Sequence, residues 1–128
     1  MYKIKNILCG IYLIIFPFDG LIAQNNGDQI LGKWVNETKT RTVEVFKNNG
    51  KYSAKIIDSI NKKEEGKLIV WGLQYQPADK EWSNGEVQLP DMTHSASCYA
   101  VLKGKKIIIT GFHGLRYFGN SETYNRKE

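Results

Sequence analysis

Histidine is scarce in this chain of 128 residues, and its scarcity limits the metal chemistry open to the protein. His94 and His113 are the only histidines, which excludes a site built from three histidine ligands. A mixed site of histidine and carboxylate ligands would need a close ligand spacing that the sequence does not show. We therefore expect both histidines to face solvent, and the sequence predicts no metal ion and no cofactor.

A strong excess of charge of one sign is also missing. The chain carries 18 Lys and Arg against 13 Asp and Glu, a formal net charge of +5. Its densest basic patches, Lys62-Lys63 and residues 103–106, fall where turns are expected, and solvated turn tips explain them without a nucleic-acid partner. No known nucleic-acid-binding motif accompanies the charge, so we exclude nucleic acid as a partner.

The sequence also lacks a group of residues that predicts catalysis. Asp79, Glu81 and Glu86 belong to a polar turn region, where carboxylates are normally solvated charges rather than an acid–base pair. Residues 94–98, "HSASC", bring histidine, serine and cysteine close in sequence, but alternate side chains of a strand point apart. We predict a protein that is not an enzyme.

Long apolar runs are absent apart from one stretch near the N-terminus, residues 7–18. This stretch is shorter than the about 20 residues that a membrane-spanning helix requires. Lys3 and Lys5 precede it and the small residue Ala23 follows it, which is the layout of a secretory signal peptide over residues 1–23. We predict export, to the periplasm or the medium, after cleavage near Ala23. An uncleaved membrane anchor is the alternative.

The remaining residues, 24–128, have the length of one domain with a modest core. Cleavage would remove Cys9 and leave Cys98 as a lone cysteine, which excludes an internal disulfide, so that packing must hold the fold together. Cys98 has no activating base beside it in the sequence, and we expect a small buried hydrophobic residue there.

What the sequence does contain is a succession of short strands. Residues 41–58 alternate apolar and polar side chains on both sides of Asn49-Gly50, the strongest signal for a tight hairpin turn. Residues 97–112 predict a second hairpin that turns at Gly104. Convincing helical periodicity is missing, so the chain is predicted to be all-β.

The apolar run of residues 68–75 is typical of a strand that is covered on both sides, and Gly72 within it suggests a bulge or bend. In all, the chain predicts about eight or nine strands spaced by roughly 8 to 12 residues. Consecutive hairpins favour an up-and-down antiparallel meander, and closing it into a barrel of about eight strands removes its exposed edges.

The two ends of the domain carry the most specific motif. Gly32-Lys33-Trp34 on the first predicted strand and Arg126 on the last are similar to the pattern of lipocalin-like (calycin) barrels, in which the arginine lies across the indole and closes one end. Trp34 and Arg126 are therefore assigned a structural role.

The wider sequence resembles the domain of unknown function family 2147, small exported bacterial proteins with a calycin-like β-barrel. The resemblance rests on four stretches in the family's order, residues 30–36, 43–57, 80–87 and 111–126. It implies a fold and a compartment, but no activity. The chain departs from the family pattern at Thr110 and Asn120, where arginines are usual, and at residues 88–90, where Tyr-Asp-Pro is usual.

Aromatic residues are more numerous than a core of this size requires. An eight-stranded barrel can be filled by side chains or can hold one small ligand, and the sequence does not distinguish the two. Our first hypothesis is a small hydrophobic or amphipathic ligand bound at Tyr52, Trp71, Tyr99 and Tyr124. The alternative is a non-enzymatic structural or interaction module of the cell envelope, with a side-chain-filled barrel and a protein partner. The oligomeric state is not predicted.

Overall fold

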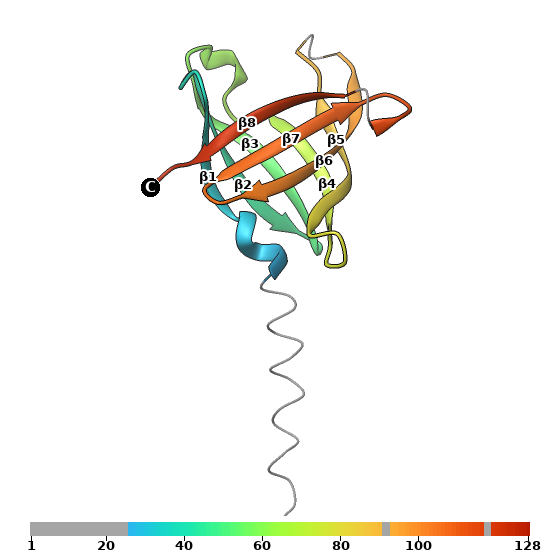
Figure 1. Ribbon diagram of the computed structural model, residues 1–128. Coiled ribbons are helices and arrows are strands. Elements are labelled where there is room, and N and C mark those ends of the chain that lie inside the picture. Colours follow the sequence, from blue (N-terminus) through green and yellow to red (C-terminus); the bar gives the residue numbers. More distant parts are fainter. Residues whose placement is uncertain (1–25, 91–92, 117–118) are drawn as a thin grey trace, which may run out of the picture.

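The structure is a computed structural model that describes residues 26–90, 93–116 and 119–128 (Figure 1). The predicted signal peptide, residues 1–23, lies outside the described residues. Within the described part of the chain, no helix has both the length and the apolar character needed to cross a membrane.

Eight antiparallel strands form one closed barrel, each strand pairing with the next in sequence and the last pairing with the first (Figure 1). The prediction of a small up-and-down antiparallel barrel is confirmed. The strands are β1 (Gly32–Asn36), β2 (Arg41–Asn48), β3 (Lys51–Ser59), β4 (Leu68–Gln76), β5 (Glu81–Gln88), β6 (Ser95–Lys103), β7 (Lys106–Phe112) and β8 (Asn120–Arg126).

Two short 3₁₀ helices, η2 and η3, accompany the strands in the described part of the chain. The first, η2 (Asp28–Ile30), precedes β1 and lies under one end of the barrel, whereas the second, η3 (Lys62–Glu64), lies in the β3–β4 connection (Figure 1). Because the strands run alternately up and down, the β2–β3, β4–β5 and β6–β7 turns share the end with η2. We call this the closed end, and the end with the other connections the open end.

The β2–β3 hairpin turns where the sequence predicts it. Asn49 and Gly50 both have positive φ, 54° and 79°, which is the combination that a type I′ turn requires. This turn matches the twist of the flanking strands, and Asn48 pairs directly with Lys51 across it. An Asn-Gly pair at this point therefore sets the register of the first hairpin by local chemistry alone.

Alternation along the strands separates the interior of the barrel from its outer surface. On β6, Ala96, Cys98 and Ala100 are buried, while the residues between them face outward. Gly72 interrupts the alternation on β4: it has φ 77°, and the β4–β5 pairing skips from Trp71 to Gln74 around it. The irregularity predicted at Gly72 is thus present as a break in the β4–β5 pairing.

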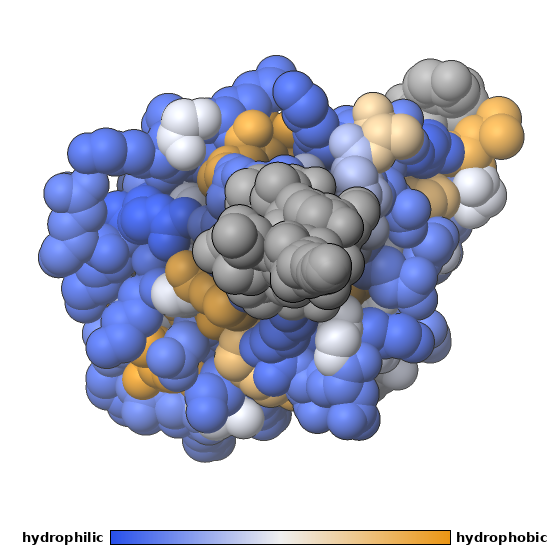
Figure 2. Space-filling view, turned by 90° about the horizontal axis from the view of Figure 1, so that it is seen from below, coloured by the Kyte–Doolittle hydropathy of each residue, from blue (hydrophilic) through white to orange (hydrophobic). Residues whose placement is uncertain are grey.

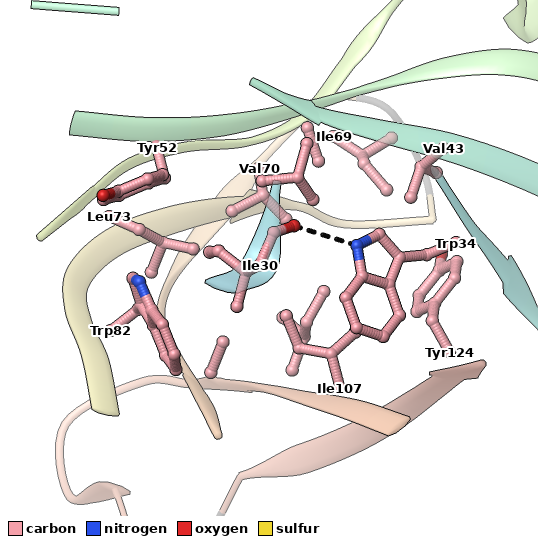
Figure 3. Close-up of a cluster of buried hydrophobic side chains, with 14 of the residues drawn as sticks. Ile30, Trp34, Val43, Tyr52, Ile69, Val70, Leu73, Trp82, Ile107 and Tyr124 are labelled. Atoms are coloured by element: carbon pink, nitrogen blue, oxygen red, sulfur yellow. Dashed lines mark hydrogen bonds between the residues drawn. The ribbon is translucent and has the colours of Figure 1, made fainter. Parts of the chain in front are cut away.

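The hydrophobic core fills the half of the barrel next to the closed end. Trp34, Trp82 and Tyr124 are its largest side chains, and each is at most 2% exposed (Figure 3). Ile30, the last residue of η2, is fully buried among them and acts as a plug inserted from the closed end. The indole N–H of Trp34 donates to the carbonyl oxygen of Ile30 at 3.0 Å, so this buried donor is satisfied.

The segment that includes η2 is attached to the barrel by further hydrogen bonds. The indole N–H of Trp82 donates to the carbonyl oxygen of Gly27 at 3.0 Å. The hydroxyl of Tyr52 donates to a carboxylate oxygen of Asp28 at 2.6 Å, and Lys47 forms an ion pair with the same carboxylate at 3.0 Å. These contacts come from β2, β3 and β5, so the segment closes this end of the barrel on several sides.

The surface around the closed end is mainly hydrophilic where it can be seen, with hydrophobic residues in small separate groups (Figure 2). Large hydrophobic side chains that are exposed in the described part of the chain are Ile60, Leu68 and Leu115. All three belong to connections or strand ends at the open end of the barrel.

Candidate functional site

A cavity of about 800 Å³ opens at the end of the barrel opposite η2. It is walled by β4–β8 and by the connections of the open end, and its volume lies within the range of small-molecule sites. Half of its apolar lining residues are buried, and the others are half-buried or exposed. These apolar residues are Ile69, Val70, Val87, Leu89, Pro90, Ala96, Ile109 and Phe112.

The cavity exists because interior side chains become smaller toward the open end. Along β7, the inward positions are Ile107, Ile109 and Gly111, and a Cβ at Gly111 would lie only 2.9 Å from Val87. On β6, the inward position nearest the open end is Ala96. The half next to the closed end is filled with indole and isoleucine side chains instead. The filled barrel of our alternative hypothesis is therefore present only in that half.

Strand β8 contributes a graded series of side chains to the interior. Arg126 and Tyr124 point inward at the closed end and in the middle, and Glu122 and Asn120 follow on the same face toward the open end. Within the seven residues of β8, Arg126 makes structural contacts at the closed end, whereas Tyr124, Glu122 and Asn120 line the cavity. Asn120 is one of the positions at which the sequence departs from the family pattern, and it lies on the cavity wall.

An ion pair at the cavity wall joins two segments distant in sequence. The guanidinium of Arg41, at the start of β2, lies 3.1 Å from a carboxylate oxygen of Glu64 in η3, and both side chains are about three-quarters buried, with 26% and 21% exposure. The hydroxyl of Ser59 donates to the same oxygen at 3.0 Å. Ser59 and Arg41, with a further contribution from Lys67, hold the pKa of Glu64 below its usual range.

Arg41 is only partly satisfied by its neighbours. Its Nε is buried and has no hydrogen-bond partner among the described residues. The guanidinium pairs with Glu64 and also interacts with the hydroxyl of Tyr124, so the donor left without an acceptor is the buried Nε.

Tyr124 links the ion pair to the second carboxylate of the cavity. Its hydroxyl donates to a carboxylate oxygen of Glu122 at 3.2 Å, and its ring is fully buried below the cavity. Burial raises the pKa of the Tyr124 phenol well above its usual value, and Glu122 adds to the shift while the nearby Arg41 opposes it. Tyr124 is therefore a neutral hydrogen-bond donor at neutral pH.

The structure places the four predicted ligand-binding residues in different surroundings. Tyr124 lines the cavity. Tyr52 is buried at the closed end, where it is bonded to Asp28. Trp71 is half-buried and lines neither the cavity nor the smaller cleft described below, whereas Tyr99 faces that cleft. Only Tyr124 is thus brought to the cavity.

The smaller cleft, of about 340 Å³, lies on β5 and β6 and is lined in part by Tyr99. The guanidinium of Arg116 lies over the Tyr99 ring at 3.8 Å and is paired with Glu81 at 2.9 Å. Cys98 borders this cleft, but its side chain is buried, and burial raises the pKa of its thiol to about 12. The thiol is therefore a poor nucleophile at neutral pH. The described residues contain no group of three or more His, Cys, Asp and Glu placed to hold a metal ion.

Sequence reasoning did not find Arg41 or Glu64. Glu64 belongs to a polar, charged connection that is typical of solvated turns, and only the fold brings it over Arg41. The alternation of β8 could have found Glu122 and Asn120, because counting back in twos from Arg126 places them on one face. The inward face of β8 was thus predictable from the sequence, but its proximity to Arg41 and Glu64 was not.

A closed, eight-stranded, up-and-down barrel with a plugged end and an open cavity defines a protein of the lipocalin-like class. The chain belongs to the family described as uncharacterized proteins conserved in bacteria (DUF2147), whose model matches residues 32–126. The resemblance seen in the sequence is confirmed. A search of curated proteins gave no match.

Among solved structures, the fold is similar to protein HP1028 from the human pathogen Helicobacter pylori, which is described as belonging to the lipocalin family. The two share 16% sequence identity over 78% of this chain and 84% of the other, with a TM-score of 0.65. At this identity the likeness concerns the fold.

Proposed function

We propose that this protein binds a small amphipathic molecule in the cavity at its open end. The observation that carries the proposal is the cavity itself, about 800 Å³ in a barrel whose other half is densely packed. Its buried apolar wall suits a hydrocarbon or ring system, because removing such a surface from water is favourable. Its polar residues suit a head group that keeps contact with solvent.

The division of the lining favours an amphipathic ligand over a wholly apolar one. Ile69, Val70 and Ala96 are at most 6% exposed and form the deep wall. Arg41 and Glu122 belong to the same cavity and carry full charges. An apolar ligand that covered these charges would remove them from water without replacing their hydrogen bonds, which is costly.

Ala96→Phe tests the proposal because its ring would occupy the deep part of the cavity. We expect the native protein to bind decanol, measured by titration calorimetry, and Ala96→Phe to lose most of that affinity. The matched control is Ser97→Phe, the neighbouring residue on β6, whose side chain faces outward and is exposed. Equal binding by both variants would place the ligand elsewhere, and a native protein that binds no amphiphile would contradict the proposal.

The same measurements address the alternative of an interaction module in the cell envelope. That hypothesis expects no small ligand and a protein partner instead. Exposed Ile60 and Leu115 on the connections of the open end are the apolar side chains such a partner would meet. Reproducible cross-linking of one envelope protein to a photoreactive residue at position 115, together with no amphiphile binding, would favour the alternative.

We also propose that the protein is exported after cleavage near Ala23. The support is the layout of residues 1–23, in which Lys3 and Lys5 precede an apolar stretch and Ala23 follows it. Mass spectrometry of the protein recovered from a bacterial periplasm should find a chain that begins at Gln24. A chain that retains residues 7–18 would instead support a membrane anchor.

A further inference from the structure

The head group of the ligand can be inferred from the charges of the cavity, on the basis of the function proposed above. The charged and titratable side chains that line it are Arg41, Glu64, His113, Glu122 and Tyr124. Apart from His113, and with the Tyr124 phenol protonated, the described lining places two carboxylates against one guanidinium. These groups together carry one more negative than positive charge.

The carboxylate of Glu64 is already compensated. Arg41 lies 3.1 Å from it, Ser59 donates to the same oxygen at 3.0 Å, and Lys67 contributes at longer range. The two members of the pair are three-quarters buried, so they are screened less by salt and solvent than surface charges are. A ligand that displaced either of them would have to replace a strong, charge-assisted bond.

Glu122 is the carboxylate without a charged partner. Among the described residues, it accepts a hydrogen bond from the neutral hydroxyl of Tyr124, at 3.2 Å. On β8, Glu122 pairs with the buried Ile109 and lies two residues from Tyr124, so it belongs to the inner face, where it is an exposed member of the cavity lining. A head group that enters with its apolar body in the cavity would come to lie beside this carboxylate.

We propose that the ligand carries a cationic head group, a protonated amine, that pairs with Glu122. An ammonium group supplies the opposite charge and the hydrogen-bond donors that this carboxylate lacks. A carboxylate head group would meet the repulsion of Glu122 and of Glu64, which already pairs with Arg41.

Three probes with the same alkyl chain and different head groups test the proposal: decylamine, decanoate and decanol. By titration calorimetry at neutral pH, we expect decylamine to bind about tenfold more tightly than decanoate, as one hydrogen bond to a charged group predicts. Glu122→Gln should lower the affinity for decylamine to about that for decanol and leave decanol unchanged. Asn120→Lys, which adds a cation on the same face of β8, should abolish the preference for decylamine.

The control is Glu44→Gln, which removes the same charge from the outer face of β2, between the buried Val43 and Val45. It should leave all three affinities unchanged. Decanol binding without a preference for decylamine would overturn the cationic head group alone, and a preference for decanoate would assign the head group to Arg41. A similar loss in Glu44→Gln would show that the preference reflects overall charge and would overturn the role of Glu122. Binding of none of the three probes would overturn the proposed function, and this inference with it.

Discussion

The guanidinium of Arg126 lies over the indole of Trp34, with 4.2 Å from its central carbon to the ring centroid, and the two residues are direct partners in the β1–β8 ladder. Arg126 also donates to the carbonyl oxygens of Leu31 and Gln29, beside the plug residue Ile30. The contact therefore joins the first strand, the last strand and the closing segment. It makes the seam of the barrel and its closed end one structural unit.

Trp34→Ala should lower the free energy of unfolding by about 3 to 5 kcal/mol, the range for truncating a buried aromatic residue. Arg126→Ala should be coupled to it by about 0.5 to 3 kcal/mol, because the two side chains are in contact. Urea unfolding of both single variants and the double variant measures the coupling. Lys33→Ala, at the exposed neighbour, is the control and should have little effect. Additive losses would show that the contact contributes nothing of its own.

Ile30→Ala should destabilise the protein by about 2 to 5 kcal/mol, because Ile30 is fully buried and its removal leaves a void in the closed end. Ile60→Ala is the matched control: the same atoms are removed from a side chain that is 78% exposed, and we expect little change. Urea unfolding measures both. Similar effects at the two positions would mean that Ile30 does not act as a plug.

Asp28 predicts a dependence of stability on pH. The hydrogen bond from Tyr52, followed by that from Lys47, lowers the pKa of Asp28 in the folded protein. A carboxyl whose folded pKa is depressed stabilises the fold above its unfolded pKa of about 3.9, and this contribution is lost as pH falls through the folded pKa.

Urea unfolding at neutral pH and near pH 3 should therefore show a smaller loss of stability on acidification in Asp28→Asn than in the native protein. Tyr52→Phe removes the largest contribution to the lowered pKa and should reduce the same pH dependence. Identical pH profiles for the native protein and Asp28→Asn would contradict this assignment.

Cys98 should be inert toward thiol reagents in the folded protein, because its side chain is buried and its pKa is raised to about 12. Labelling of the chain that begins at Gln24 with a thiol-reactive dye should be slow in buffer and fast in urea. Ser97→Cys in a Cys98→Ser background provides an exposed thiol at the next position of β6 and should react at once. Rapid labelling of native Cys98 would show that β6 opens readily.

Local features of the fold were readable from the sequence, because their causes lie within a few residues. Asn49 and Gly50 tolerate positive φ and so determine the first hairpin turn, and Gly72 interrupts the pairing of β4 with β5. The alternation at Val43 and Val45 on β2 and at Cys98 and Ala100 on β6 identified the inner face of these two strands. A barrel followed from the succession of such hairpins.

The function of individual tyrosines could not be assigned in this way. Tyr52 and Tyr124 both face the interior, but Tyr52 lies near the β2–β3 turn at the closed end, and Tyr124 lies at the floor of the cavity. Which aromatic residues meet a ligand depends on which end of the barrel is plugged. The plug is Ile30, on a segment outside the strands.

The sequence by itself thus determined the all-β class, the hairpins, the family and the contact of Trp34 on the first strand with Arg126 on the last. Only the tertiary structure decided that one half is packed and the other open, and that Arg41, Glu64 and Glu122 share one cavity. The physical reason is the distance along the sequence over which each feature is determined. Turn conformations and alternation are set by neighbours in sequence, whereas a cavity is set by the register of all eight strands around a closed barrel.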